Sequence, residues 1–463
     1  MTSRLLRVPT LLRIGRAARR GSGAPVGRFV VLMCGTVALA IGFLVIAGSW
    51  AVYEERARHE SARLPSGVAR GHGVKAWVSS GYDTLQDHMQ FMVFSIDPVT
   101  TDAPLPPGLP RWPEPGEAFV SPQLLKDGAG EQIADRYGKF AGVIGKEGLG
   151  VPDERVVWRR PVQKGSLRGG AGAEEFVGPE RAKGMRGGDG ESDFIFSWRE
   201  FSWAVLPLLV FPALVLLYVA NGFGVEGRRR RDVLLETLGA GAGQRRWVRV
   251  GDVTGPVLTG VGVVAVGAIV VAWSSPRLPV TGFVIPGEYL RLHWTVLAGA
   301  LAAAGTLTVA WAALVPTRRR QNSTRPVRVS EGDQRARLLA FPAALLATVR
   351  LPDLLDPGYP HGAVWSLTYL VSSAVTFLML PVTLGSLAGA AGHVVAAWGR
   401  RRGSTSAIVG GRRLSAFPSA TARTTAGAAV LVGILLQASV YSDLFTRTAQ
   451  PGSTGGVGVI RGE

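Results

Sequence analysis

The chain alternates long uncharged apolar runs with short basic segments. A helix of about 20 residues crosses a hydrocarbon core of about 30 Å, so each run is long enough to span a membrane. The runs lie at residues 29–53, 201–223, 253–274, 294–315, 363–399 and 424–442. This pattern predicts a multi-pass α-helical membrane protein.

The run at residues 363–399 has two interpretations. It fits one long helix, or a hairpin that turns near residues 381–385. Basic segments flank it on both sides, and basic segments stay in the cytoplasm, so an even number of crossings is favoured. We therefore predict a hairpin of two spans.

The long segment at residues 54–198 has a different composition. It holds 18 basic and 21 acidic residues, with Pro/Gly turn signals and β-like pieces at residues 90–96 and 115–121. Such patterns indicate short strands separated by turns. We predict one small α+β extracytoplasmic domain between the first and second spans, with a flexible Gly-rich tether at residues 165–192.

The remaining residues carry the excess of positive charge, 33 basic against 12 acidic, mostly beside the apolar runs. This distribution indicates membrane orientation and not a nucleic-acid surface. Residues 1–28 carry seven arginines and no acid. The cytoplasmic parts are therefore predicted to be residues 1–28, 224–252 and 317–361, the last a linker with a surface helix around residues 336–349; the tail, 443–463, is predicted to be extracytoplasmic.

The first apolar run also has the order of a signal peptide, with Ala47 and Ser49 suited to cleavage before Trp50. Its length favours a retained anchor.

The sequence predicts no catalytic, cofactor-binding or metal site. Cys34 is the single cysteine, and the six histidines have no metal-ligand spacing. Residues 142–147 lack the spaced glycine and the hydroxyl of a phosphate-binding loop. The spans contain no Asp, Glu, Lys or Arg, so no intramembrane proton relay is expected and the chain is predicted not to be an enzyme.

The most distinctive stretch is the basic loop at residues 224–252. It opens with four consecutive arginines, continues at residues 232–238 with apolar and charged positions at helical spacing, and reaches Gly239, where a helix ends easily. A second basic patch contains Arg245, Arg246 and Arg249. We predict a short amphipathic helix at the cytoplasmic membrane surface.

The order of these residues resembles the cytoplasmic loop of FtsX-like, MacB-type ABC transporter permeases. The resemblance rests on an arginine cluster, an apolar and acidic helix, Leu238-Gly239-Ala240 and a basic run. It implies a separate ATP-binding subunit, which would hold ATP and Mg, and a homodimer or heterodimer of permeases. The expected contacts with that subunit are Leu234, Leu235, Glu236, Leu238 and Gly239. The arginines expected to face lipid headgroups or the partner are Arg228, Arg229, Arg230, Arg231, Arg245 and Arg246.

The resemblance implies a permease subunit in a bacterial plasma membrane, with its N-terminus in the cytoplasm. ATP hydrolysis in the partner would move the extracytoplasmic domain and export or extract a lipid, peptide or drug. Two alternatives stay open: a non-transporting regulator whose external domain controls a cell-wall enzyme or senses a ligand, and a half-permease that needs a second chain. Long members of the family have ten spans, and here about seven are expected, with residues 424–442 as the first helix of a second repeat.

Overall fold

The computed structural model of the chain forms two compact units, one made mainly of helices and one built around a β-sheet. The first comprises Met1–Gly48, Trp198–Val270 and Trp294–Val440, and the second Ser49–Ser197, Val271–His293 and Tyr441–Glu463. The structure describes residues 8–18, 25–63, 65–66, 74–86, 90–168, 171–173, 175–176, 198–222, 225–278, 284–314, 331–355 and 363–416. The predicted span at 424–442 and the tail at 443–463 lie outside these residues.

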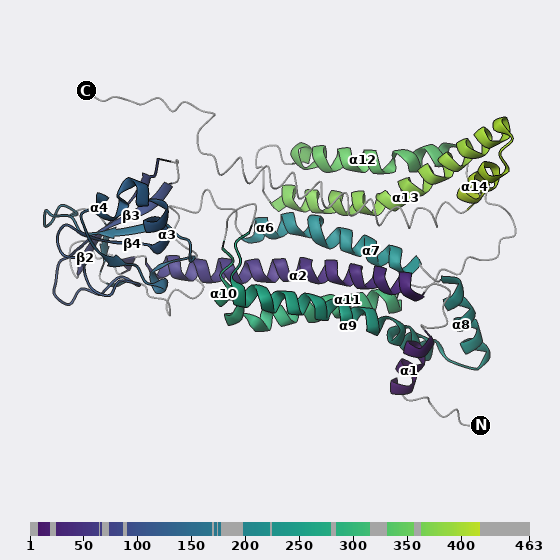
Figure 1. Ribbon diagram of the computed structural model, residues 1–463, viewed down its shortest axis with the longest axis horizontal. Coiled ribbons are helices and arrows are strands. Elements are labelled where there is room, and N and C mark those ends of the chain that lie inside the picture. The colour runs from purple at the N-terminus through teal and green to yellow at the C-terminus, as the bar shows by residue number, and fades with distance from the viewer. Residues whose placement is uncertain are drawn as a thin grey trace. The chain divides into compact units, whose positions relative to one another are not determined.

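The helices follow the apolar runs of the sequence (Figure 1). Within the first unit, or beginning in it, they are α1 (Val8–Ala18), α2 (Pro25–Ala62), α6 (Trp198–Val205), the π-helical turn η5 (Leu206–Val210), α7 (Phe211–Gly222), α8 (Val225–Thr237), α9 (Ala242–Ser274), α11 (Trp294–Leu314), α12 (Glu331–Leu355), α13 (Ala363–Arg402) and α14 (Thr405–Ala416).

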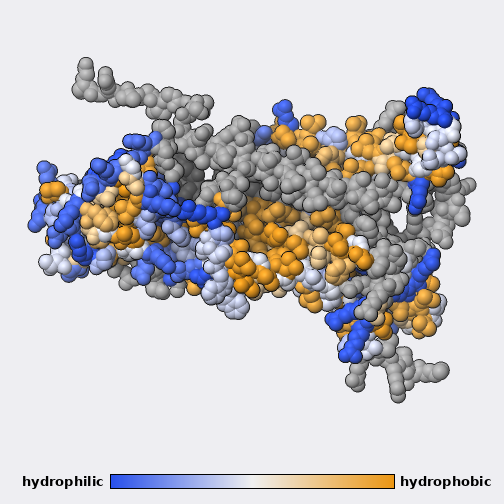
Figure 2. All heavy atoms as spheres, in the orientation of Figure 1, coloured by the Kyte–Doolittle hydropathy of each residue, from blue (hydrophilic) through white to orange (hydrophobic). Residues whose placement is uncertain are grey.

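Five described helices are long and apolar enough to cross a membrane: Val26–Ala62, Ala242–Ser274, Trp294–Ala313, Ala336–Leu355 and Leu367–Arg402. Large apolar side chains lie exposed along α9 (Figure 2), among them Leu258, Val263, Val266 and Ile269. A soluble protein rarely exposes a contiguous apolar surface of this kind. The described residues are mostly helical with a small sheet region, and these apolar helices are consistent with a membrane protein.

The core of the first unit forms where α2, α7, α9 and α11 pack together around Leu39, Leu217, Val253 and Ala304. Small residues allow close contact: a Cβ on Gly260 would lie 3.1 Å from the carbonyl oxygen of Met33. A small residue at this position lets the two helices approach closely.

The short helix α1 crosses the start of α9 through two glycines. A Cβ on Gly15 would lie 2.2 Å from the Val248 carbonyl oxygen, and one on Gly251 would lie 2.4 Å from that of Leu12. Neither site has room for a side chain, so this contact depends on glycine on both helices.

The second predicted span is built from three helical pieces, α6, η5 and α7. The π-helical turn contains Pro207. Proline has no N–H and its ring clashes with the preceding turn, which explains why α-helical geometry is interrupted here.

The predicted hairpin at residues 363–399 is wrong. The segment is one continuous helix, α13, and its antiparallel partner is α12. The predicted surface helix of the linker is longer than expected, Glu331–Leu355, and Ala336–Leu355 is apolar enough to cross a membrane. Together, α12 and α13 would give an even number of crossings between the arginines at residues 318–320 and those at residues 400–402.

The Thr383 hydroxyl of α13 contacts the backbone of α12. It accepts from the Phe341 N–H (3.1 Å) and donates to the Arg337 carbonyl (3.0 Å), two groups one helical turn apart. Pro342, which has no N–H, directly follows Phe341 inside the helix. Farther along, the hydroxyls of Thr348 and Thr376 lie 2.8 Å apart.

The second unit contains a mixed six-stranded sheet in the order β5-β4-β6-β3-β2-β7, and β1 pairs with β8. The strands are β1 (Pro65–Ser66), β2 (Ala76–Thr84), β3 (Gln90–Pro98), β4 (Glu117–Val120), β5 (Lys139–Val143), β6 (Val156–Arg159), β7 (Ala171–Ala173) and β8 (Glu175–Phe176). Its short helices are α3 (Pro122–Asp127), η2 (Ala129–Glu131), α4 (Ile133–Arg136), η3 (Lys146–Gly148) and α10 (Gly287–Leu292). The β-like pieces predicted at residues 90–96 and 115–121 correspond to β3 and β4.

Both faces of this sheet are covered, because side chains alternate along the central strands. Phe119 and Trp158 point into one apolar cluster, and Val120 and Val157 into the other, which α3 and α4 cover with Leu124 and Ile133. Part of the predicted flexible tether belongs to the sheet instead: β7 pairs with β2, and Phe176 of β8 is buried against Trp158.

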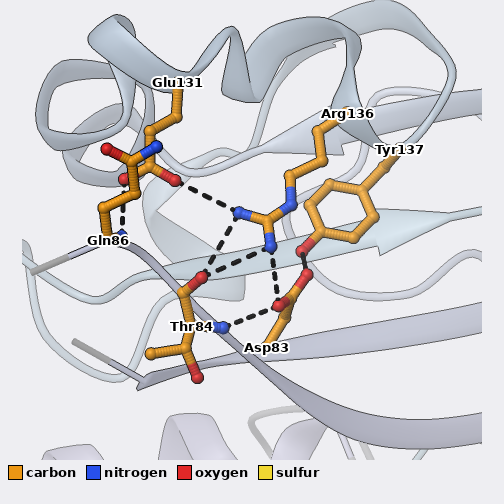
Figure 3. Close-up of polar contacts among 6 residues, drawn as sticks. All are labelled: Asp83, Thr84, Gln86, Glu131, Arg136 and Tyr137. Atoms are coloured by element: carbon orange, nitrogen blue, oxygen red, sulfur yellow. Dashed lines mark hydrogen bonds and ion pairs between the residues drawn. The ribbon is translucent and has the colours of Figure 1, made fainter. Parts of the chain in front are cut away.

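A polar cluster joins the end of β2 to α4 (Figure 3). Arg136 pairs with Asp83 at 2.8 Å and also reaches the Thr84 carbonyl and Glu131. The Tyr137 hydroxyl donates to Asp83. Burial disfavours the Asp83 carboxylate, but its hydrogen bonds from Tyr137 and the Thr84 N–H and the charge of Arg136 outweigh this and lower its pKa.

The loop between the third and fourth spans belongs to the same unit as the sheet. The Tyr289 hydroxyl of α10 donates to the Gly150 carbonyl at 2.9 Å, and His293 lies 3.0 Å from Glu55. These contacts place the loop and the 54–198 domain in one unit.

Candidate functional site

The basic loop forms a helix, α8, followed by a tight turn into α9. The turn is a Schellman motif: the Gly239 N–H donates to the Glu236 carbonyl at 2.9 Å, and the Ala240 N–H donates to the Leu235 carbonyl at 2.8 Å. Gly239 has φ +82°, a left-handed conformation that favours glycine. The prediction that a helix ends at Gly239 is confirmed.

The two faces of α8 are arranged in the opposite way to those of an ordinary surface helix. Its charged residues Arg228 and Asp232 are buried, whereas Val233, Leu234 and Leu238 at its C-terminal end are exposed, Leu234 to 63% and Leu238 to 82%. A helix at a protein surface normally buries its apolar stripe. We call Val233, Leu234 and Leu238 the apolar edge of α8.

The buried face of α8 contacts a carboxylate at the start of the third span. Oδ2 of Asp252, which is 2% exposed, accepts from Arg28 of α2 and lies 3.4 Å from Nη2 of Arg231. Arg228 donates to the Asn221 carbonyl at the end of α7. We call Arg28, Asn221, Arg228, Arg231 and Asp252 the Asp252 cluster; it joins α2, α7, α8 and α9.

Two further ion pairs connect α8 to the basic beginning of α9. Arg249 pairs with Asp232 at 2.7 Å and Arg245 with Glu236 at 2.9 Å. The first is largely buried and the second is exposed at Glu236, so the first contributes more to holding the helices together.

The Asp252 cluster has more positive than negative charge. Burial lowers the pKa of Arg228 to about 10, and the charge of Arg28 acts in the same direction while Asp252 opposes it. The main cause is the removal of the guanidinium from water, and the neighbouring arginine charges add to it.

The structure places the predicted partner contacts in one region. Leu234, Glu236, Leu238 and Gly239 are exposed and Leu235 is half-buried, so this segment is accessible to another molecule. Arg230 and Arg246 are exposed, and Arg245 is half-buried.

Two of the arginines that were expected to face headgroups or a partner make contacts within the chain. Arg228 is 6% exposed and points into the chain, and Arg231 pairs with Asp252. Both turn inward because a buried carboxylate lies there. The side chain of Arg229 lies outside the described residues.

Sequence reasoning missed Arg28 and Asp252. Arg28 lies 224 residues from Asp252, so no local pattern connects the two. The available signal was Asp252 itself, a single acid directly before an apolar run in a strongly basic loop.

In the described residues, no group of three or more His, Cys, Asp or Glu side chains could hold a metal ion. Comparisons of the chain with protein-family models, curated proteins and solved structures gave no match.

Proposed function

We propose that the chain is a permease subunit of an ABC complex in a bacterial plasma membrane, powered by a separate ATP-binding subunit that docks on α8. The observation that carries the proposal is the apolar edge of α8, which is exposed at the end of a helix whose other face is fixed by ion pairs.

The physical argument concerns transmission of force. A contact that moves a helix moves the membrane segments only if the helix is firmly attached to them. The Asp252 cluster and the Arg249–Asp232 pair attach α8 to α2 and α9, so a push on the apolar edge reaches both helices. ATP and Mg would be held by the partner, and the cargo would be an amphiphile such as a lipid, peptide or drug.

The test is affinity purification of the full chain from its native membrane, followed by quantitative mass spectrometry of co-purified ATP-binding proteins. Leu234→Asp with Leu238→Asp removes the apolar edge. Burying one leucine contributes about 1.5–3 kcal/mol, so the pair is expected to weaken binding about 100-fold or more. Val409→Asp, which changes an equally exposed apolar residue of α14, is the matched control and should leave the partner bound.

If the wild-type chain captures no ATP-binding protein, or the double variant captures as much as wild type, the proposal is wrong. Capture of such a protein without substrate-stimulated ATP hydrolysis would favour the regulatory alternative, in which nothing crosses the membrane. Activity only after addition of a second permease chain would identify a half-permease.

A further inference from the structure

The Asp252 cluster has more buried donors than acceptors, and this imbalance points to a missing anion. Arg28 and Arg231 pair with the single carboxylate of Asp252, and Arg228 donates to the Asn221 carbonyl without an ion-pair partner of its own among the contacts of the cluster. Within the described part of the chain, the Nε atoms of all three arginines and the side-chain nitrogen of Asn221 are buried without a hydrogen-bond partner; Oδ1 of Asp252 is the one acceptor of the cluster in the same state, so unpaired donors outnumber it four to one.

Such an arrangement is costly if nothing else is bound. Each buried polar group that lacks a partner loses its hydration without compensation, and a buried charge without a counter-ion loses more. The Arg249–Asp232 pair beside the cluster is neutral overall, so it does not balance the excess. An anion with several acceptor oxygens would balance the charge and accept from the unpaired donors together.

The geometry favours a phosphate group. Guanidinium groups bind phosphate oxygens through paired N–H donors, and several arginines around one phosphate are a common arrangement.

The depth of the cluster in the membrane identifies the source of that phosphate. Arg28 directly precedes the first apolar run, Asp252 directly precedes the third, and Asn221 lies at the end of the second. All three therefore lie where apolar helix meets the aqueous side, which is the level of lipid headgroups. By the positive-inside rule this is the cytoplasmic leaflet, where basic pockets between helices bind anionic headgroups.

We propose that the Asp252 cluster is a specific binding site for the phosphate of an anionic phospholipid headgroup, held by Arg28, Arg228 and Arg231. The site differs from the diffuse attraction of lipid to exposed arginines because two of its three arginines are nine-tenths buried. It involves the inward-turned side chains of α8 and does not depend on the chain being a permease.

The test uses the full chain in detergent, stripped of lipid, with thermal unfolding followed by tryptophan fluorescence. Short-chain phosphatidylglycerol should raise the wild-type Tm by about 2 °C or more, through mass action on the folded state. Short-chain phosphatidylcholine should not. Inorganic phosphate is the third ligand: a similar shift with it would show that the site accepts a free phosphate as well as a headgroup.

Arg228→Gln should abolish the shift, and in the absence of lipid this variant should have a higher Tm than wild type, because an unbalanced buried charge has been removed. Arg246→Gln makes the same change at an exposed arginine in the same loop and should keep the shift. If Arg228→Gln does not fold, Arg231→Gln tests the same site. The proposal is wrong if phosphatidylglycerol does not shift the wild-type Tm, if phosphatidylcholine shifts it as much, or if the Arg228 or Arg231 variant responds as wild type does.

Discussion

Replacing Asp252 by Asn should release α8 from the membrane helices. The side chain of Asp252 is 1% exposed and is the carboxylate that Arg28 and Arg231 share. Asparagine keeps the shape but removes the charge, which leaves both arginines without a counter-ion. Removing one partner of a buried ion pair costs about 3–5 kcal/mol, which corresponds to a population change of roughly two to four powers of ten.

Hydrogen exchange of α8 in the full chain, in lipid-stripped detergent, measures this effect directly. Local opening of a helix exposes its amides, so exchange across α8 should accelerate by at least about 100-fold. Glu236→Gln, which removes an exposed acid paired with Arg245, should change exchange by less than about tenfold, because such pairs contribute roughly 0–1 kcal/mol.

A double-mutant cycle with Arg28→Gln isolates the pair. The double variant should be more protected than the sum of the two single effects predicts, since both charges are then gone. Equal exchange in Asp252→Asn and Glu236→Gln would refute the claim that the Asp252 cluster anchors α8.

Three further predictions concern other parts of the chain. Gly239→Ala should destabilise the end of α8 by about 1–2 kcal/mol, because φ is +82° while the space around the position is open; Gly241→Ala is the control, and hydrogen exchange is the measurement. Because the pKa of Asp83 is lowered in the folded state, its contacts stabilise the sheet unit fully above the unfolded pKa of about 3.9. This stabilisation is lost as pH falls through the lower folded pKa. Asp83→Asn should therefore remove the acid dependence of hydrogen exchange in β2 and α4. In a chain whose Cys34 is replaced by Ser, Asp353→Cys at the end of α12 should react with an impermeant maleimide from outside the cell; reaction only after lysis would return α12 to the cytoplasmic linker.

The sequence predicted those elements that depend on local pattern. Uncharged length located α2, α9 and α11, and Gly239 located the end of α8. In each case the determining residues lie within or beside the element itself, so a short window of sequence contains the necessary information.

The errors arose where the determining contact is distant or where two structures share one pattern. Apolar length alone does not separate a long helix from a hairpin, and the choice at residues 363–399 depended on α12, whose apolar character is diluted by Arg337, Arg350 and Asp353. Similarly, a row of arginines predicts exposed side chains, because the local sequence does not show that a carboxylate elsewhere in the chain pairs with one of them in the interior.

The Thr383 hydroxyl opposes sliding between α12 and α13. A slide of one helix along the other by a single turn would separate this hydroxyl from both the Phe341 N–H and the Arg337 carbonyl, which are one helical turn apart in α12. Each hydrogen bond contributes about 0.5–1.5 kcal/mol, so a rearrangement that keeps the two helices in register is favoured over one that slides them past each other.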